Sequence, residues 1–398
     1  MKHQKFSKFI LLGSLYTSQY IPVMFLYQAL PVFLRQQGAS LESISLINLI
    51  ALPLMFKFLL APFIDSFSIA RWGHYRFWII SLQITVAILT AICAFLDITN
   101  NITLAIVVLF GMILFSSTQD IATDALAVNL LKPEERGLGN AIQTGGNYLG
   151  AIIGGGGILI LLGKFGWRAS LLFMSVVMLL SLIPILGYRE KEKVNTITFR
   201  SPVTYLQTFV KFCRRPGITA WLLIIILSTA GAGMANTMFQ PLLVDAGLSL
   251  NEIALLRGVV SYSLSIVGAL IAGLLITRWG RKKSLIFFTI LNTIVTAGFI
   301  LPGIGFRNLT TLYIVSIGFS LVFTMLTTCI YAIMMDKTTE AFAATEYSFQ
   351  ISVLYIGGII PGLFSGVIVN AIGYAALFAI AAIICLLPLP IILQQDAS

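Results

Sequence analysis

Two aspartates in an otherwise apolar stretch are the strongest candidates for chemistry in this sequence. Asp120 and Asp124 stand four positions apart in "SSTQDIATDALA", a spacing that puts both on one face of a helix. Lys57, in "LMFKFLLAP", lies at a comparable depth of another apolar stretch and could neutralise one of them. Two acids and one lysine leave one carboxylate without a cation, and that group could take up a proton. The pattern predicts proton coupling, contact with a substrate or a static ion pair.

Amide and phenol side chains recur in several apolar stretches and offer hydrogen bonds to a bound molecule. Those of the first stretch lie on both sides of Pro22, where a helix is expected to bend. Hydrogen bonds between neighbouring helices would use the same groups equally well. The candidates for lining a substrate cavity are Tyr16, Gln19, Tyr20, Tyr27, Gln28, Gln119, Gln143, Asn147, Tyr148, Gln350 and Tyr355.

Two further charges belong to the second half of the chain. Arg257, in "EIALLRGVVSY", could anchor an anionic substrate or extend to the membrane interface. Glu346, in "ATEYSFQ", is either a loop charge or a second protonatable group. The four cysteines are scattered without a CxxC pair or a paired histidine, so we expect no cofactor, metal site or disulfide.

The elements that must hold these side chains are membrane helices. Of the 398 residues, 58% are hydrophobic and only 10% are charged, whereas soluble domains have about a quarter charged residues. Apolar runs of about 20 residues, the length that crosses a bilayer, recur along the chain. We therefore expect an all-α membrane protein with twelve transmembrane spans, at 9–34, 42–64, 77–96, 102–131, 140–163, 166–188, 218–246, 252–277, 284–303, 308–336, 346–370 and 372–393.

The distribution of basic residues predicts how the spans are oriented. A net charge of +10 could suggest a nucleic-acid partner. With the N-terminus in the cytoplasm, however, most of the 25 Lys and Arg residues fall on the inner side, as the positive-inside rule requires. We therefore expect both termini in the cytoplasm, a lipid bilayer around the helices and no nucleic-acid partner.

The sequence contains an internal duplication. "RWGHYR" begins at Arg71 and "RWGRKK" at Arg278, which is 207 positions later, and Tyr148 and Tyr355 share the same offset. A repeat of about 200 residues with six spans in each copy predicts two pseudo-symmetric six-helix bundles of the same orientation.

The duplication also predicts the domain boundaries. We expect an N-terminal bundle at 1–188, a cytoplasmic linker at 189–217 and a C-terminal bundle at 218–398. The second part of the linker alternates apolar and basic residues at helical spacing, so it is either a short helix on the inner membrane surface or a solvated connection.

The repeated glycine-centred turn is a candidate gate on the cytoplasmic side. Glycine permits the tight reversal, and the basic residues could pair with carboxylates and helix C-termini. The first copy has an acid before the glycine, whereas the second has Thr277 where an acid would be expected. The turn could hold the two halves in one state, or it could serve only as positive-inside anchoring. The candidate gating residues are Asp65, Arg71, Gly73, Arg76, Arg278, Gly280 and Arg281.

Four consecutive glycines, Gly154–Gly157, lie within an apolar span. They follow no predicted strand and precede no Lys-Ser/Thr pair, so they predict close helix packing rather than a phosphate-binding loop.

Several stretches resemble one branch of a known transporter family. "YQALPVFLRQQGASLESISL", "ALPLMFKFLLAPFIDSF", "SSTQDIATDALAVNLLKPEERGLGNAI" and "GNYLGAIIGGG" look like the AmpG-like branch of the major facilitator superfamily. That branch includes muropeptide permeases, acetyl-CoA transporters and siderophore permeases of the RhtX/FptX type. The similarity is concentrated in about the first 160 residues.

The resemblance implies a function. We expect an alternating-access, proton-coupled transporter of a small molecule, monomeric and placed in the inner membrane of a Gram-negative bacterium. The compact layout is closer to the siderophore permeases, so the expected substrate is a ferric siderophore. A muropeptide is the alternative substrate. A membrane-embedded enzyme with Asp120 and Asp124 as catalytic carboxylates is a remote alternative.

Overall fold

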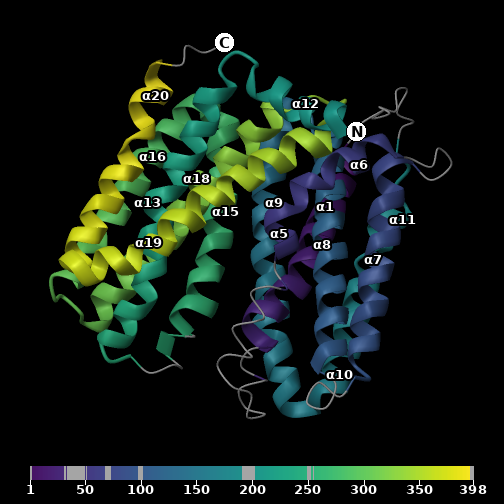
Figure 1. Ribbon diagram of the computed structural model, residues 1–398, viewed down its shortest axis with the longest axis horizontal. Helices are drawn as coiled ribbons and strands as arrows, with labels where there is room; N and C mark the ends of the chain where they lie inside the picture. Colours follow the sequence, from purple (N-terminus) through teal and green to yellow (C-terminus); the bar gives the residue numbers. More distant parts are fainter. Residues whose placement is uncertain are drawn as a thin grey trace. The chain divides into compact units, whose positions relative to one another are not determined.

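The computed structural model describes residues 2–30, 33, 50, 52–67, 73–96, 102–190, 202–248, 252–253 and 255–394. Within these ranges the regular elements are helices and no strand is present (Figure 1), which confirms the expected all-helical fold class. Of the candidate residues, Arg71 lies outside the described ranges.

The helices follow the chain as a series of long apolar elements separated by short ones. In order they are α1 Lys2–Met24, η1 Phe25–Ala29, α5 Leu52–Phe56, η2 Lys57–Leu59, α6 Ala61–Ser66, α7 His74–Cys93, α8 Ile102–Leu130, η4 Pro133–Glu135, α9 Arg136–Ala151, η5 Ile152–Gly157, α10 Ile158–Leu180, α11 Ile183–Leu186, α12 Pro202–Cys213, α13 Ile218–Asp245, η6 Leu255–Val260, α15 Ser261–Trp279, α16 Arg281–Gly298, α17 Ile300–Gly303, α18 Leu309–Lys337, α19 Ala343–Leu386 and α20 Pro388–Gln394.

Nine helical stretches within the described residues are long and apolar enough to cross a membrane. Two of them, Pro133–Leu186 and Ala343–Gln394, are about twice the length of one span. Each contains a glycine with non-helical dihedral angles, Gly166 in the first and Gly373 in the second. At these glycines the chain passes from one expected span to the next. The expected span at 42–64 is described only from residue 50 onward, with a gap at residue 51. The count of twelve therefore stays partly a prediction.

Contacts divide the chain into two compact units, each of which takes a short segment from the other half of the sequence. The first unit consists of residues 1–132, 145–205 and 338–348, and the second of residues 133–144, 206–337 and 349–398. The start of α9 thus belongs to the second unit, and the first turns of α19 belong to the first. The boundaries expected from the duplication, at 1–188, 189–217 and 218–398, stay a prediction.

The two copies of the repeat share their backbone conformation at the glycines. Gly73 and Gly280, 207 positions apart, have φ of +84° and +79°. Gly166 and Gly373, separated by the same offset, have φ of +74° and +84°. These angles are unfavourable for residues with a side chain, so both positions of each pair need glycine for the same turn. This agreement supports the duplication.

Small residues let the first and fifth spans approach closely. Gly146, Gly150 and Gly154 follow at intervals of four, and a Cβ at any of them would contact the backbone of α1. A Cβ on Gly154 would lie 2.1 Å from the Ile21 carbonyl oxygen, and one on Gly155 would lie 2.1 Å from Oε1 of Gln28. The prediction of close packing is confirmed for these two members of the four-glycine run.

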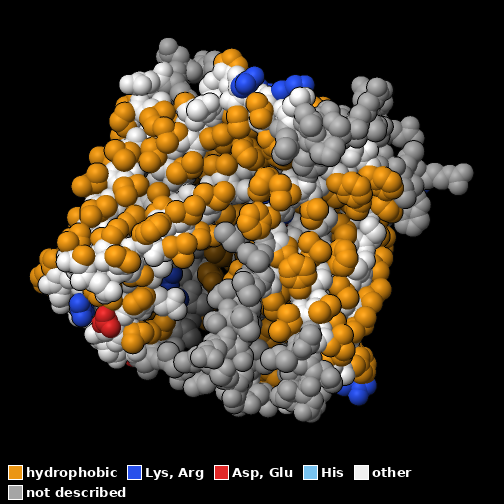
Figure 2. Space-filling model, in the orientation of Figure 1, with side chains coloured by type: hydrophobic (Ala, Val, Ile, Leu, Met, Phe, Trp, Pro, Cys, Tyr) orange, Lys and Arg blue, Asp and Glu red, His pale blue; other side chains and the backbone are white. Residues whose placement is uncertain are grey.

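Each unit has its own apolar core, and apolar side chains also cover its outside. In the second unit the ring of Phe299 packs with Phe239, Phe319 and Phe378 at centroid distances of 4.6 to 5.4 Å. Figure 2 shows hydrophobic side chains over most of the described face. An apolar surface of this size is unfavourable in water and is typical of helices in contact with lipid.

Candidate functional site

Three charged side chains meet inside the first unit. Lys57 forms ion pairs with Oδ2 of Asp120 and, at 3.7 Å, with Oδ2 of Asp124. The side chains of Lys57 and Asp124 are each 2% exposed, whereas that of Asp120 is 30% exposed. The structure thus brings the three intramembrane charges predicted from the sequence into one cluster.

A break in the second span positions Lys57. Proline at position 62 has no N–H to give to the carbonyl of Phe58, so a regular helix cannot continue through this turn. The chain instead forms the 3-10 turn η2, in which the Leu60 amide donates to the Lys57 carbonyl at 2.9 Å. The sequence pattern suggested one continuous span here and did not predict this break.

Two residues of α1 supply further donors to the acids. The Tyr16 hydroxyl donates to Oδ1 of Asp124 at 3.0 Å, and Nε2 of Gln19 donates to Oδ1 of Asp120 at 3.2 Å. Tyr16 and Gln19 are buried, so each acid is held by Lys57 and by a neutral donor from the first span. These five residues form what we call the charge cluster: Tyr16, Gln19, Lys57, Asp120 and Asp124.

The two acids of the charge cluster are chemically unequal. Burying an ion pair costs desolvation free energy, which the surrounding hydrogen bonds must offset. Asp124 is enclosed on all sides, whereas Asp120 keeps about a third of its side chain exposed and can meet a proton donor or a solute. With one ammonium group and two carboxylates, the cluster has a net negative charge unless one acid is protonated.

Two buried amides, one in the charge cluster and one next to Asp120 in the sequence, have polar atoms that make no hydrogen bond within the described residues. Oε1 of Gln19 and both amide atoms of Gln119 make no hydrogen bond within the described part of the chain. A buried amide without a partner costs free energy, so these atoms are places where a water molecule or a solute could bind. Gln119 thus stays a candidate for the cavity, although the charge cluster does not include it.

The C-terminal part of the first span departs from regular helix geometry. Residues Phe25–Ala29 form the π-helix η1, in which Tyr27 is 43% exposed, and Nε2 of Gln28 donates to Sδ of Met24 at 3.5 Å. Tyr20, nearer the middle, is half-buried. Wide π turns are often found at functional sites, and this one directs a tyrosine outward.

The repeat-related amides and phenols occupy different environments. Gln143 is buried, while Asn147, Tyr148 and Tyr355 are half-buried. Gln350 is fully buried: its Oε1 accepts from Nε1 of Trp221 at 2.8 Å and its Nε2 donates to the Met334 carbonyl at 3.2 Å. A substrate could reach Gln350 only by replacing these contacts, so its geometry is that of a packing residue.

Arg257 and Glu346 also have local partners. Arg257, in the π-helix η6, donates to Oδ1 of Asn236, and its guanidinium group lies 5.7 Å from the ring centre of Phe239. Glu346 accepts from the backbone amide and the hydroxyl of Thr339 at 2.8 and 3.2 Å, which fixes the turn before α19.

Near the first copy of the glycine-centred turn, Asp65 is fully buried and bonded to the start of α19. Its Oδ1 accepts from the Tyr75 hydroxyl at 2.8 Å and from the Ala344 amide at 3.2 Å. Its Oδ2 accepts from the amide and the hydroxyl of Thr345, both at 2.8 Å. The first amides of a helix have no intrahelical acceptor, and a carboxylate there is also stabilised by the helix dipole.

Arg76 of the first turn is attached to the end of the sixth span. The Arg76 guanidinium group donates to the carbonyls of Ile185 and Leu186, both at 3.1 Å. The Tyr75 and Arg76 amides donate to the carboxylate of Glu190 at 3.2 and 2.8 Å.

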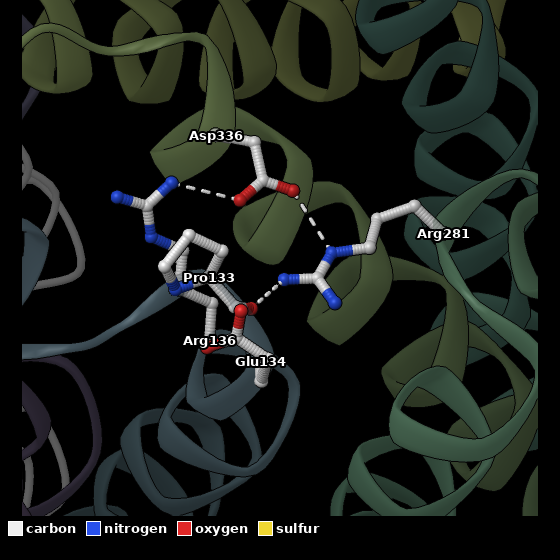
Figure 3. A pocket seen from close by; sticks show the side chains of 5 residues that line it. All are labelled: Pro133, Glu134, Arg136, Arg281 and Asp336. Atoms are coloured by element: carbon white, nitrogen blue, oxygen red, sulfur yellow. Dashed lines mark hydrogen bonds and ion pairs between the residues drawn. The ribbon is translucent and has the colours of Figure 1, made fainter. Parts of the chain in front are cut away.

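In the second unit, the turn is held by an acid from another helix. Asp336, near the end of α18, accepts from Nη1 of Arg136 at 2.8 Å and from Nε of Arg281 at 2.9 Å. Arg281 also donates to the Pro133 carbonyl. Figure 3 shows both arginines pointing toward the Asp336 carboxylate, at a pocket of about 400 Å³ that Glu134 also lines. Arg278 of the same turn is exposed.

Five residues whose side chains form these turn contacts were not among the sequence candidates: Tyr75, Arg136, Glu190, Asp336 and Thr345. Asp336 is the acid that the second turn lacks at Thr277, but it comes from a different helix and no spacing within the turn points to it. Tyr75 lies inside the repeat "RWGHYR", where its counterpart at the offset of 207 is Lys282, so the repeat does not single it out.

Comparison with known proteins identifies relatives over nearly the whole chain. The family model described as Major Facilitator Superfamily matches residues 12–361. The anhydromuropeptide permease of Escherichia coli strain K12 is 27% identical over 387 residues, which cover 94% of this chain and 77% of that protein. A putative transporter AmpG 4 of Rickettsia conorii is 24% identical over 392 residues, covering 95% and 94%.

Solved structures show the same fold. The human organic anion transporter MFSD10 superposes with a TM-score of 0.75 at 16% sequence identity, covering 97% of this chain and 98% of that one. At this identity the likeness concerns the fold alone.

Proposed function

The chain belongs to the major facilitator superfamily, with its relatives in the AmpG-like branch, and from this premise we propose that it imports anhydromuropeptides into the bacterial cytoplasm. It is a multi-pass membrane transporter by family. The substrate, the direction of transport, the inner-membrane location and the cytoplasmic placing of both termini are parts of the proposal.

The named relatives favour a muropeptide over a ferric siderophore. The E. coli relative is an anhydromuropeptide permease and the R. conorii relative a putative AmpG transporter, and siderophore import finds no support among them. A muropeptide carries carboxylates, amides and sugar hydroxyls. Tyrosine, glutamine and lysine side chains such as those of α1 and the charge cluster offer matching hydrogen bonds.

The structural observation that carries the proposed proton-coupled transport is the unequal pair of acids around Lys57. Because one lysine cannot neutralise two carboxylates, a proton or a cationic group of the solute is needed to balance the charge cluster. The exposed side of Asp120 supports its role as the acid that exchanges protons or meets the solute, and the enclosed Asp124 suits a structural role. The transporter would then couple import to the inward flow of protons.

The two sets of turn contacts suit a gate on the cytoplasmic side. In the first unit Asp65 holds the start of α19, and in the second unit Asp336 holds Arg136 and Arg281. Each set joins segments from opposite halves of the sequence. Movement of the halves in alternating access would break such contacts in one state and restore them in the other.

Transport into proteoliposomes tests the function directly. Purified protein should accumulate labelled anhydromuropeptide against its gradient when an inward proton gradient is imposed, and the solute should be recovered chemically unchanged. Asp120→Asn should abolish this accumulation. Asp245→Asn, which changes an exposed acid at the end of α13, is the matched control and should leave accumulation intact.

Three results would count against the proposal. Accumulation of a ferric siderophore without that of the muropeptide would return the assignment to siderophore import. Recovery of a chemically altered solute would favour an enzyme. Undiminished uphill transport by both Asp120→Asn and Asp124→Asn would mean that the carboxylates are structural and do not couple transport to protons.

A further inference from the structure

We propose that Tyr75 and Glu190 are positioning residues that hold Asp65 against the first turn of α19, so that the chain leaving the sixth span controls the strength of that contact. The inference rests on the proposed alternating-access transport for its functional meaning. Four residues of the first unit, which we call the relay, would regulate the proposed cytoplasmic gate: Glu190, Tyr75, Asp65 and Thr345.

The relay begins at the carboxylate of Glu190. The helix α7 begins at His74 after Gly73, which has no side chain to bond the first amides of the helix. Glu190, more than 110 positions later in the chain, takes this role: its two oxygens accept from the amides of Tyr75 and Arg76. These amides have no acceptor within α7, so Glu190 fixes where its first turn lies.

The glycine of the turn makes room for this carboxylate. A Cβ on Gly73 would lie 2.8 Å from Oε2 and 2.9 Å from Cβ of Glu190, so any other residue would displace it. Arg76 strengthens the same attachment, since its guanidinium group bonds to the carbonyls of Ile185 and Leu186. The start of α7 is therefore bonded to the end of the sixth span through both backbone and side chain.

The relay continues through the ring of Tyr75. Its backbone amide is bonded to Glu190, and its hydroxyl donates to Asp65 at 2.8 Å. Tyr75 is 1% exposed and Asp65 is fully buried. A buried carboxylate depends strongly on its donors, and the Tyr75 hydroxyl donates to the same oxygen that accepts from Ala344. Displacing the first turn of α7 would therefore withdraw a donor from Asp65 and weaken its hold on α19.

The second copy of the turn shows that this relay is not needed to form the turn. Gly280 adopts the same positive φ, yet a Cβ placed on it would have no atom within 4 Å. In this copy Thr277 stands where an acid would be expected, and at the offset of 207 Tyr75 corresponds to Lys282. Because the turn folds in the second unit without such a carboxylate and tyrosine, their presence in the first unit calls for another role, which is to position Asp65.

Hydrogen–deuterium exchange on the full-length protein in nanodiscs tests the relay without any substrate. Tyr75→Phe removes only the hydroxyl, and Glu190→Gln replaces one acceptor oxygen by an amide. Each should raise the exchange rate of the segment 338–348, which contains the Ala344 and Thr345 amides, by about tenfold, the factor that corresponds to losing one hydrogen bond to a charged group. Tyr374→Phe is the matched control, because it removes a similar tyrosine–aspartate bond, to Asp245 at 2.7 Å, and should leave this segment unchanged.

Transport kinetics supply the second readout. In the proposed alternating-access cycle, the contact at Asp65 would belong to the state that is closed toward the cytoplasm, so weakening it should lower the population of that state and raise the KM for external substrate. Glu190→Asp, which keeps the carboxylate, should raise the KM less than Glu190→Gln does. A purely structural role would lower the amount of active protein without changing KM.

Two results would overturn the inference. One is an unchanged exchange rate in segment 338–348 for both Tyr75→Phe and Glu190→Gln in folded protein. The other is an equal rise of exchange throughout all the helices, which would mean general destabilisation. If the wild-type protein fails to transport anhydromuropeptide, the proposed substrate falls, but the exchange result still decides the relay.

Discussion

Asp65 and Thr345 lie 280 positions apart in the sequence and share two hydrogen bonds, from the backbone amide and the hydroxyl of Thr345 to one oxygen of the Asp65 carboxylate. A residue at the end of the second span thus caps the helix α19 in the way that an N-cap residue caps its own helix. The second carboxylate oxygen accepts from Ala344 and Tyr75. Both oxygens of Asp65 therefore act as acceptors.

Asp65→Asn should weaken this cap, because the amide nitrogen of asparagine cannot accept a hydrogen bond. We expect a loss of about 1.5–3 kcal/mol in the interaction with α19, the range for hydrogen bonds to a charged group, and a large decrease in transport rate. Thermal unfolding and proteoliposome uptake measure the two effects. Ser66→Ala, which changes the neighbouring half-buried residue, should have little effect. Equal behaviour of the two variants would contradict the assignment.

Lys57→Met should be one of the most damaging single substitutions. It leaves two carboxylates, one of them 2% exposed, without their cation, and an uncompensated buried charge of this kind costs about 3–5 kcal/mol. The thermal stability of the purified protein should fall accordingly. Lys164→Met, which removes an exposed lysine, serves as the control.

A double variant separates loss of charge balance from loss of packing. Adding Asp120→Asn to Lys57→Met removes one of the two stranded charges, so part of the lost stability should return. If the double variant is less stable than Lys57→Met alone, the lysine contributes mainly through packing and the charge-balance account fails.

The sequence alone was sufficient to predict the helical fold and the charged residues that meet inside the first unit. Apolar runs and the constant offset of 207 predicted the helical fold and the duplicated turns, because both depend on local patterns. The grouping of Lys57 with Asp120 and Asp124 was predictable as well. Charges in a membrane are costly, so few such residues exist and they must find one another.

Contacts between distant segments could not be predicted in this way. Asp336 replaces the acid missing at Thr277, yet it belongs to the end of another helix. Glu190 is one of several charges in "REKEK", and nothing in that stretch distinguishes it from its neighbours. Gln350 matched Gln143 by the repeat, but its amide bonds to Trp221 and Met334. In each case the partner is set by packing between helices and leaves no periodic pattern.

The contacts around Asp336 should depend on salt, whereas those around Asp65 should not. Arg136, Arg281 and Asp336 are 12%, 24% and 29% exposed, so mobile ions can screen their ion pairs. A double-mutant cycle of Arg136→Gln and Asp336→Asn should give a coupling of about 0.5–1 kcal/mol at low salt that largely disappears at high salt. Arg278→Gln, in the same turn and exposed, is the control. A coupling that persists at high salt would show that the pairs are held by packing rather than by charge.

The four-glycine run should respond differently at each position to the addition of one methyl group. A Cβ on Gly154 would lie 2.1 Å from the carbonyl oxygen of Ile21, which is backbone and cannot move aside without separating the spans. Gly154→Ala should therefore lower the free energy of unfolding by about 1–3 kcal/mol, as overpacking does elsewhere.

The other glycines of the run should tolerate a methyl group better. At Gly155 the nearest atom belongs to the flexible side chain of Gln28, so Gly155→Ala should cost less. Gly156 is exposed with no atom within 4 Å, and Gly156→Ala should be neutral or slightly stabilising, since alanine favours helix over glycine. Thermal unfolding of the three purified variants tests this order, and equal losses at Gly154 and Gly156 would show that the run serves chain flexibility rather than close packing.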